Sequence, residues 1–181
     1  YVWDAGGENI YYRGTTTNEV PVTFKISFKL DGQSVSADEI AGKSGALEMT
    51  FDYINNCKKT VEIDGKNEEM YVPFLMISGM ILDNDHFKNI TVDNGKVIDD
   101  GDKTVVAGFA LPGLSDNLAL SDGTDIDIPS SVTIKADVTD FSLATTLTVA
   151  TNDVFNKVSI DDDDTVEEIE DKLDTLDSSM K

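Results

Sequence analysis

Apolar and polar residues alternate without a break over residues 22–30. A period of two places one set of side chains on one face of a strand, so this segment predicts a half-buried strand of an antiparallel sheet. Asp31-Gly32 follows it as a hairpin-type turn. A second alternation over residues 47–53 predicts another half-buried strand of the same kind.

The segment between these two strands has the signature of a short helix. Ser36 followed by Glu39 matches a capping box, in which each residue satisfies a backbone group of the other. Gly42 is the residue type that ends helices. We therefore expect a short crossover helix between the strands.

Residues 72–82 are almost all apolar, which predicts a strand buried on both faces. Pro73 belongs near the start of such a strand, where no backbone donor is missed. Gly79 suggests a bulge or bend.

Turn residues separate the short strands that follow, which we expect at 89–92, 96–98 and 104–110, after an earlier short strand at 61–63. The turns are Asp93-Asn94-Gly95, Asp99-Asp100-Gly101-Asp102 and Asp122-Gly123. No long amphipathic helix lies between the strands, which argues against parallel βαβ units and favours a sandwich or barrel.

Residues 131–151 form a long β-like stretch in which the apolar positions change parity at Asp140. One flat strand cannot keep the same face buried across such a change. We therefore predict that the chain crosses from one sheet to another near Thr139-Asp140.

These patterns predict an all-β fold, mainly an antiparallel β-sandwich, with one crossover helix and a C-terminal α-helix that starts a coiled coil. Residues 1–160 form the β-rich domain, of one or two sub-sheets, and 161–181 an acidic linker and the helix. The predicted core residues are Phe24, Ile26, Phe28, Met49, Phe51, Phe74, Met76, Leu143 and Leu147.

After four successive aspartates at 161–164, the apolar period changes to 3.5. Thr165 with Glu168 fits a capping box, and negative charge stabilises a helix start. The apolar positions are spaced 3, 4, 3, 4 as in a coiled coil. We call these residues the seam: Val166, Ile169, Leu173, Leu176 and Met180.

About two heptads are too few to be stable alone, so the seam needs a partner. Its acidic flanks disfavour two parallel copies. The narrow stripe favours a partner helix with basic flanks, from another protein or from further along the same polypeptide. The alternative is that the helix folds back onto the β-domain.

Charge limits the partners further. Fourteen lysines and arginines against 35 aspartates and glutamates give a net charge of −21. Such a charge repels phosphates, so no nucleic-acid partner is expected. No apolar run approaches the roughly 18 residues that span a bilayer, so this segment is not expected to cross a membrane. The chain starts without methionine, and we expect it to be a domain of a longer protein.

No catalytic, cofactor-binding or metal-binding residue is predicted. Gly42-Lys43-Ser44 resembles the end of a phosphate loop, but Ala37 stands where that motif needs glycine. Nothing pairs the single cysteine, Cys57, with the single histidine, His86. Scattered carboxylates could form a glycosidase pair, but none is singled out.

Two binding alternatives stay open. Asp-rich turns at 83–85, at 99–102 and at Asp122, Asp125 and Asp127 offer the oxygen ligands that calcium prefers, although tight turns select the same residues. Trp3 and Tyr11-Tyr12 could contact a cell-wall glycan or pack under the first strand.

Several segments together resemble the extracytoplasmic β-rich region of large membrane proteins of Gram-positive bacteria, loosely grouped with the phage-infection-protein (YhgE/Pip) family. The segments are 2–5 (Val-Trp-Asp-Ala), 10–16, 30–32 with 41–45, 72–74 with 78–82, 94–98 and 110–114 (Ala-Leu-Pro-Gly-Leu). The resemblance implies export, membrane tethering and a heptad stalk, and it carries over no catalytic residue.

The function expected from these observations is a non-catalytic, cell-surface structural or interaction module, adhesion-like, of a membrane-anchored protein. It would be extracellular and tethered to the bacterial membrane. The alternatives are a glycan- or calcium-binding module and, third, an enzyme that acts on glycans.

Overall fold

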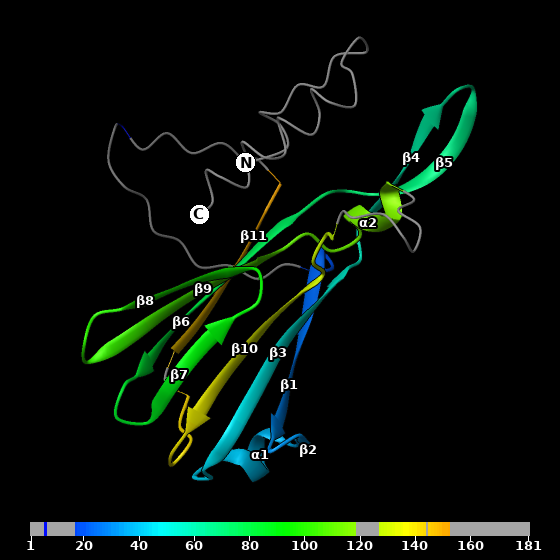
Figure 1. Ribbon diagram of the computed structural model, residues 1–181. Helices are drawn as coiled ribbons and strands as arrows, with labels where there is room; N and C mark the ends of the chain where they lie inside the picture. Colours follow the sequence, from blue (N-terminus) through cyan, green and yellow to red (C-terminus); the bar gives the residue numbers. More distant parts are fainter. Residues whose placement is uncertain (1–5, 7–16, 119–126, 144, 153–181) are drawn as a thin grey trace.

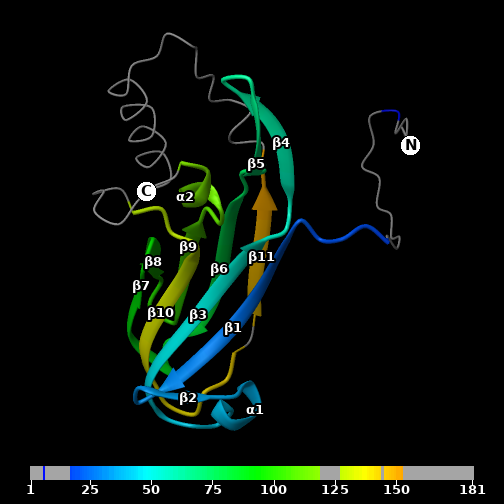
Figure 2. The same cartoon turned by 90° about the vertical axis from the view of Figure 1, so that its right-hand side faces the viewer.

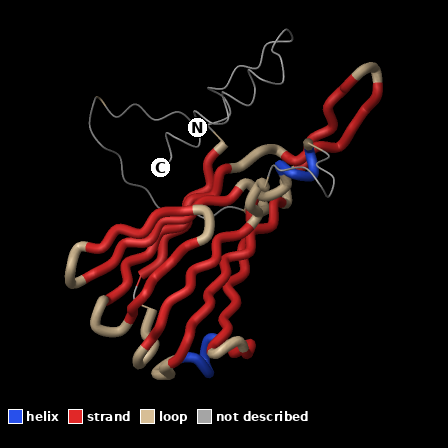
Figure 3. Tube along the Cα trace, in the orientation of Figure 1, coloured by secondary structure: helices blue, strands red, loops and turns tan. Residues whose placement is uncertain are grey.

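The computed structural model describes residues 6, 17–118, 127–143 and 145–152. Within them strands dominate (Figure 3), and every strand pairing is antiparallel. The five-stranded sheet has the order β2 (Gln33–Val35), β1 (Val22–Leu30), β3 (Gly45–Asn55), β10 (Ser131–Val138) and β7 (Phe87–Val92). The four-stranded sheet has the order β11 (Thr145–Thr151), β6 (Leu75–Asp83), β9 (Lys103–Ala110) and β8 (Gly95–Asp99).

The two sheets face each other (Figures 1 and 2), and the buried side chains form one cluster that draws on both. The predicted all-β fold is therefore confirmed as sandwich-like. A separate hairpin, β4 (Lys58–Ile63) and β5 (Lys66–Tyr71), projects beyond the sheets (Figure 1). Two short helices are α1 (Ala37–Ile40) and α2 (Leu114–Asn117).

The first predicted strands and the crossover helix are confirmed. β1 pairs with β3 over nine consecutive residues without a register shift. Asp31 and Gly32 form a two-residue turn into β2, both with positive φ, as such turns require. In α1 the Ser36 side chain accepts a hydrogen bond from the Glu39 amide and the Glu39 carboxylate accepts one from the Ser36 amide, which is the predicted capping box.

The predicted crossing between sheets is also confirmed. β10 lies in the five-stranded sheet and β11 in the four-stranded one. Asp140 has a φ of 54°, and its amide donates to the Ser44 hydroxyl. Backbone bonds from Phe141 to Lys43 and from Gly42 to Phe141 fix the crossing against the end of the α1 loop. Phe141 is thereby inserted into the core, with its ring against those of Phe28 and Phe87.

Seven of the nine predicted core residues lie in or against the core. Met49, Phe51 and Met76 are buried. The partly buried ones that pack against the cluster are Ile26, Phe28, Phe74 and Leu143. Phe24 and Leu147 are wrong, since they are 50% and 64% exposed.

Both errors have a structural reason. β2 pairs only with residues 28–30 of β1, so the first half of β1 lies at an open sheet edge and Phe24 is covered on one side, by Tyr53. Leu147 lies on the outer face of the four-stranded sheet, opposite Gly79. The next residue, Thr148, points inward and bonds to Ser78, and neighbouring residues of a strand point to opposite sides. The parity of β11 is thus opposite to the one expected.

The apolar run 72–82 was also misjudged. β6 begins after Pro73 and buries its inner face, with Met76, Met80 and Leu82 inside, whereas its outer face is buried at Leu75 and exposed at Ile77 and Ile81. Gly79 pairs in continuous register with both neighbouring strands, so it forms no bulge.

Three hydroxyl groups join the two sheets. The Tyr53 hydroxyl on β3 is hydrogen-bonded to the Ser78 hydroxyl on β6, and Ser78 lies 2.8 Å from the Thr148 hydroxyl on β11. Burial raises the pKa of Tyr53, because the charged phenolate loses its hydration inside the sandwich.

Replacement of Tyr53 by phenylalanine should test this connection. At pH 8 we expect a loss of about 1 kcal/mol of stability. The unfolded tyrosine ionises near pH 10 while the folded one stays neutral, so the native protein loses stability as pH rises above about 10. Urea unfolding at pH 8 and 10.5 should therefore show the difference between the two proteins shrinking. A difference that does not change with pH would contradict the buried phenol.

Core truncation gives a second test with a matched control. Phe51 is 1% exposed, and Phe51→Ala should cost about 3–5 kcal/mol, as buried aromatic truncations do. Phe24→Ala, in a half-exposed ring of the same sheet, should cost about 1 kcal/mol or less. Urea unfolding of both variants checks this, and equal losses would contradict the core assignment.

Candidate functional site

The seam, which is predicted to bind a partner helix, lies outside the described residues: Val166, Ile169, Leu173, Leu176 and Met180. Five residues of the two open binding alternatives also lie outside them: Trp3, Tyr11 and Tyr12 for glycan, and Asp122 and Asp125 for calcium. Their predicted roles stay predictions. The structure contributes two surface depressions and the outer faces of the two sheets.

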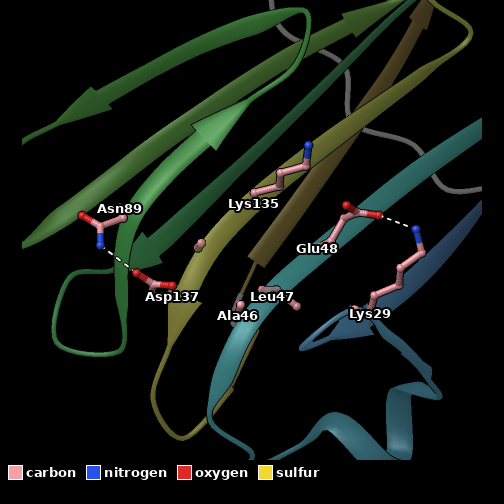
Figure 4. A pocket seen from close by; sticks show the side chains of 9 residues that line it. Lys29, Ala46, Leu47, Glu48, Asn89, Lys135 and Asp137 are labelled. Carbon is pink, nitrogen blue, oxygen red and sulfur yellow. Dashed lines mark hydrogen bonds and ion pairs between the residues drawn. The ribbon is translucent and has the colours of Figure 1, made fainter.

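The first depression, of ≈ 260 Å³, lies on the outer face of the five-stranded sheet (Figure 4). Lys29 and Glu48 form an ion pair of 2.6 Å across β1 and β3, and Glu48 faces Lys135 on β10. On the other side the Asn89 amide donates to Asp137 over 2.7 Å. Opposite charges on neighbouring strands stabilise a sheet, which is the ordinary role of such a ladder.

Two carboxylates therefore line this depression, as a glycosidase would need, but their environment does not suit the reaction. The hydrogen bond from Lys29 lowers the pKa of Glu48 and keeps it ionised. A general acid needs the opposite, a carboxyl whose pKa is raised so that it holds a proton near neutral pH. Asp137 is engaged by Asn89.

The second depression, of ≈ 350 Å³, lies beside two of the Asp-rich turns. Asn84, in the β6–β7 turn, donates to the Asp99 carboxylate over 2.8 Å and to the Gly101 carbonyl over 2.9 Å, and accepts from Thr104. The Gly101 amide, and then Asn84, lower the pKa of Asp99 by hydrogen bonding to its charged form. Asn84 thus holds the two turns together.

Side-chain oxygens of Asn84 and Asp99 are engaged in hydrogen bonds within and between these turns and to Thr104. Across residues 17–118, 127–143 and 145–152, no group of three or more His, Cys, Asp or Glu side chains is arranged to hold a metal ion. The described turns therefore give the calcium alternative no set of ligands. Two residues of that alternative, Asp122 and Asp125, lie outside the described residues.

The remaining candidate residues have structural roles or lie apart. Lys43 and Ser44, in the phosphate-loop-like segment, fix the crossing through the Lys43 carbonyl and the Ser44 hydroxyl. Cys57 follows the far end of β3, whereas His86 bonds to Thr139 at the end where β3 begins. The two ends of this 11-residue strand lie ten residue steps, or about 33 Å, apart.

The two outer faces differ in chemistry. The five-stranded sheet turns charged side chains outward, in cross-strand rows such as Lys25 with Asp52 and Lys29 with Glu48. The four-stranded sheet turns aliphatic side chains outward. We call its exposed residues the outer apolar face: Ile77, Ile81, Ile98, Val105, Leu147 and Val149, between 39% and 64% exposed.

Sequence reasoning missed this face although its signal was present. The unbroken apolar run 72–82 indicated that both faces of β6 need cover, and this was interpreted as burial within the domain. The described residues cover the inner face of β6 and, on its outer face, Leu75 but not Ile77 or Ile81. An exposed apolar patch of this kind usually marks an interaction site.

Comparisons with protein-family models, with curated proteins and with solved structures find no match. The described part of the chain contains no helix long and apolar enough to cross a membrane.

Salt and calcium distinguish self-repulsion from metal binding. With a net charge of −21, the thermal midpoint should rise in sodium chloride, because ions screen the repulsion. Calcium at matched ionic strength should add nothing further. A much larger rise in calcium would favour the calcium-binding alternative, and an unchanged midpoint in sodium chloride would contradict the repulsion argument.

Proposed function

We propose that this chain is a non-catalytic structural or interaction module of an exported, membrane-anchored bacterial protein. It acts by binding or spacing rather than by turnover. The observation that carries this proposal is the outer apolar face, because water-exposed aliphatic residues gathered on one sheet suit contact with another protein surface.

The contrast between the two outer faces supports the same function. The charged face of the five-stranded sheet suits contact with water, and the high negative charge favours solubility and discourages non-specific association. Because one outer face is charged and the other apolar, a protein partner would contact the module from the apolar side.

The location and the tether rest on the resemblance to extracytoplasmic regions of Gram-positive membrane proteins. In this proposal the C-terminal helix, with its seam, links the domain to the remainder of its polypeptide or to a protein partner. Cell-wall glycan remains an alternative ligand, with the polar depression around Lys29, Glu48 and Asp137 as the place for it.

The location can be tested on intact cells. An epitope placed at the Asp64-Gly65 turn of the projecting hairpin, in the full-length protein, should be labelled by antibody and removed by external protease without lysis. A cytoplasmic protein carrying the same epitope is the control and should be labelled only after lysis. Labelling of the hairpin epitope only after lysis would overturn the extracellular proposal.

The mode of action needs a second test. We expect no retention of the purified protein on cell-wall sacculi. If it is retained, and if the Lys29→Ala/Glu48→Ala double variant is not, the glycan-binding alternative replaces the proposed function. Far-UV circular dichroism of the variant confirms that the sheet is intact.

A further inference from the structure

The outer apolar face carries aliphatic side chains from all four strands of its sheet. On the edge strand β11, Leu147 and Val149 point outward, whereas Thr148 points toward the other sheet and hydrogen-bonds to Ser78. An exposed aliphatic surface that is continuous over several strands usually marks an interaction site. We therefore look for the segment that covers this face.

The strand register divides the face into rows. One row joins Ile81, Val105 and Ile98 across three strands, and another joins Val149, Ile77 and Phe109. The row between them has the small residues Gly79 and Ala107 at its centre and Leu147 and Lys96 at its two ends. The outer rows lie about 13 Å apart, so a helix of about 10 Å diameter can rest on this face above its low centre.

The chain itself offers a segment that fits. The seam spans 15 residues, from Val166 to Met180, or about 21 Å of helix, and four strands extend over about 15–19 Å. The predicted helical segment 165–181 is separated by 13 residues from the end of β11, the edge strand of this sheet. The nine residues 152–160 alone can reach about 30 Å when extended, which is enough to return to any point of the face.

A second copy fits less well. The face measures roughly 450 Å² per copy, or about 900 Å² in a symmetric pair, below the ~1,200 Å² of stable interfaces. A segment of the same chain docks without the loss of translational freedom that association costs.

We propose that segment 165–181 docks as a helix on the outer apolar face, with the seam against the sheet. This goes beyond the proposed function and revises it at one point: the seam of the same chain, rather than another protein surface, covers the outer apolar face. Any helical stalk would then begin after these two heptads.

Cysteine crosslinking in the full 181-residue chain tests this docking. In a Cys57→Ser background, Ala107→Cys between the two rows is combined with Leu173→Cys at the middle of the seam. A short thiol crosslinker should give a crosslink within one molecule, identified by peptide mass spectrometry. The matched control pairs Leu173→Cys with Thr133→Cys, a half-buried position on the outer face of the other sheet, and should give at least tenfold less product.

The other outcomes each overturn the proposal. A crosslink between molecules would show that a second copy covers the face. A crosslink from Ala107→Cys to Trp3→Cys in place of Leu173→Cys would assign the face to the N-terminal segment. Equal yields at Ala107 and Thr133, or no crosslink in a chain whose circular dichroism is unchanged, would show that the seam has no site on the domain.

Discussion

Side chains of a β-strand point alternately to the two sides of its sheet, and in the four-stranded sheet both sides carry apolar residues. The rest of the structure depends on how each of these two apolar sides is covered. The inner side, with Met76, Met80 and Leu82, finds its cover in the five-stranded sheet and forms the core. The outer side, with Ile77 and Ile81, has the same composition and no equivalent layer among residues 17–118, 127–143 and 145–152. A sheet that is apolar on both sides is suited to the middle layer of an assembly.

The chain passes between the two sheets several times, and the connection from β10 to β11 is fixed by contacts with the loop after α1. The chain leaves the five-stranded sheet after Val138 and enters the four-stranded sheet at Thr145. Asp140, in a left-handed conformation, and Phe141, inserted into the core, make the change of direction. The loop after α1 receives both through backbone and Ser44 contacts. A segment that looked like a remnant of a phosphate loop is therefore part of the joint between the sheets.

The predictable parts of the fold were those encoded locally. The alternation in β1 and β3, the capping box at Ser36 and the change of parity at Asp140 each lie within a few residues of chain, and all are found in the structure. Phe24 and Leu147 could not be placed this way, because the exposure of Phe24 depends on which strand lies at the sheet edge and that of Leu147 on which side of its sheet faces the core. That outcome follows from pairings between segments about 80 residues apart, such as β3 with β10.

The candidate site followed the same division. The seam is a local pattern and was predicted, but it lies outside the described residues. The outer apolar face has members on β6, β8, β9 and β11 and exists only once these strands are ordered side by side. The run 72–82 indicated two apolar faces for one strand, but it could not show which would remain open, because a period-two pattern carries no information about neighbours.

The central claim is that the outer apolar face is an interaction surface that is covered in the working protein. Hydroxyl-radical footprinting of the full chain, read residue by residue by mass spectrometry, tests it most directly. The account predicts slow oxidation of Ile77, Ile81 and Leu147 and fast oxidation of Phe24, the half-exposed ring at the open edge of β1. Oxidation of all four residues in proportion to their exposure in the sandwich alone would contradict it.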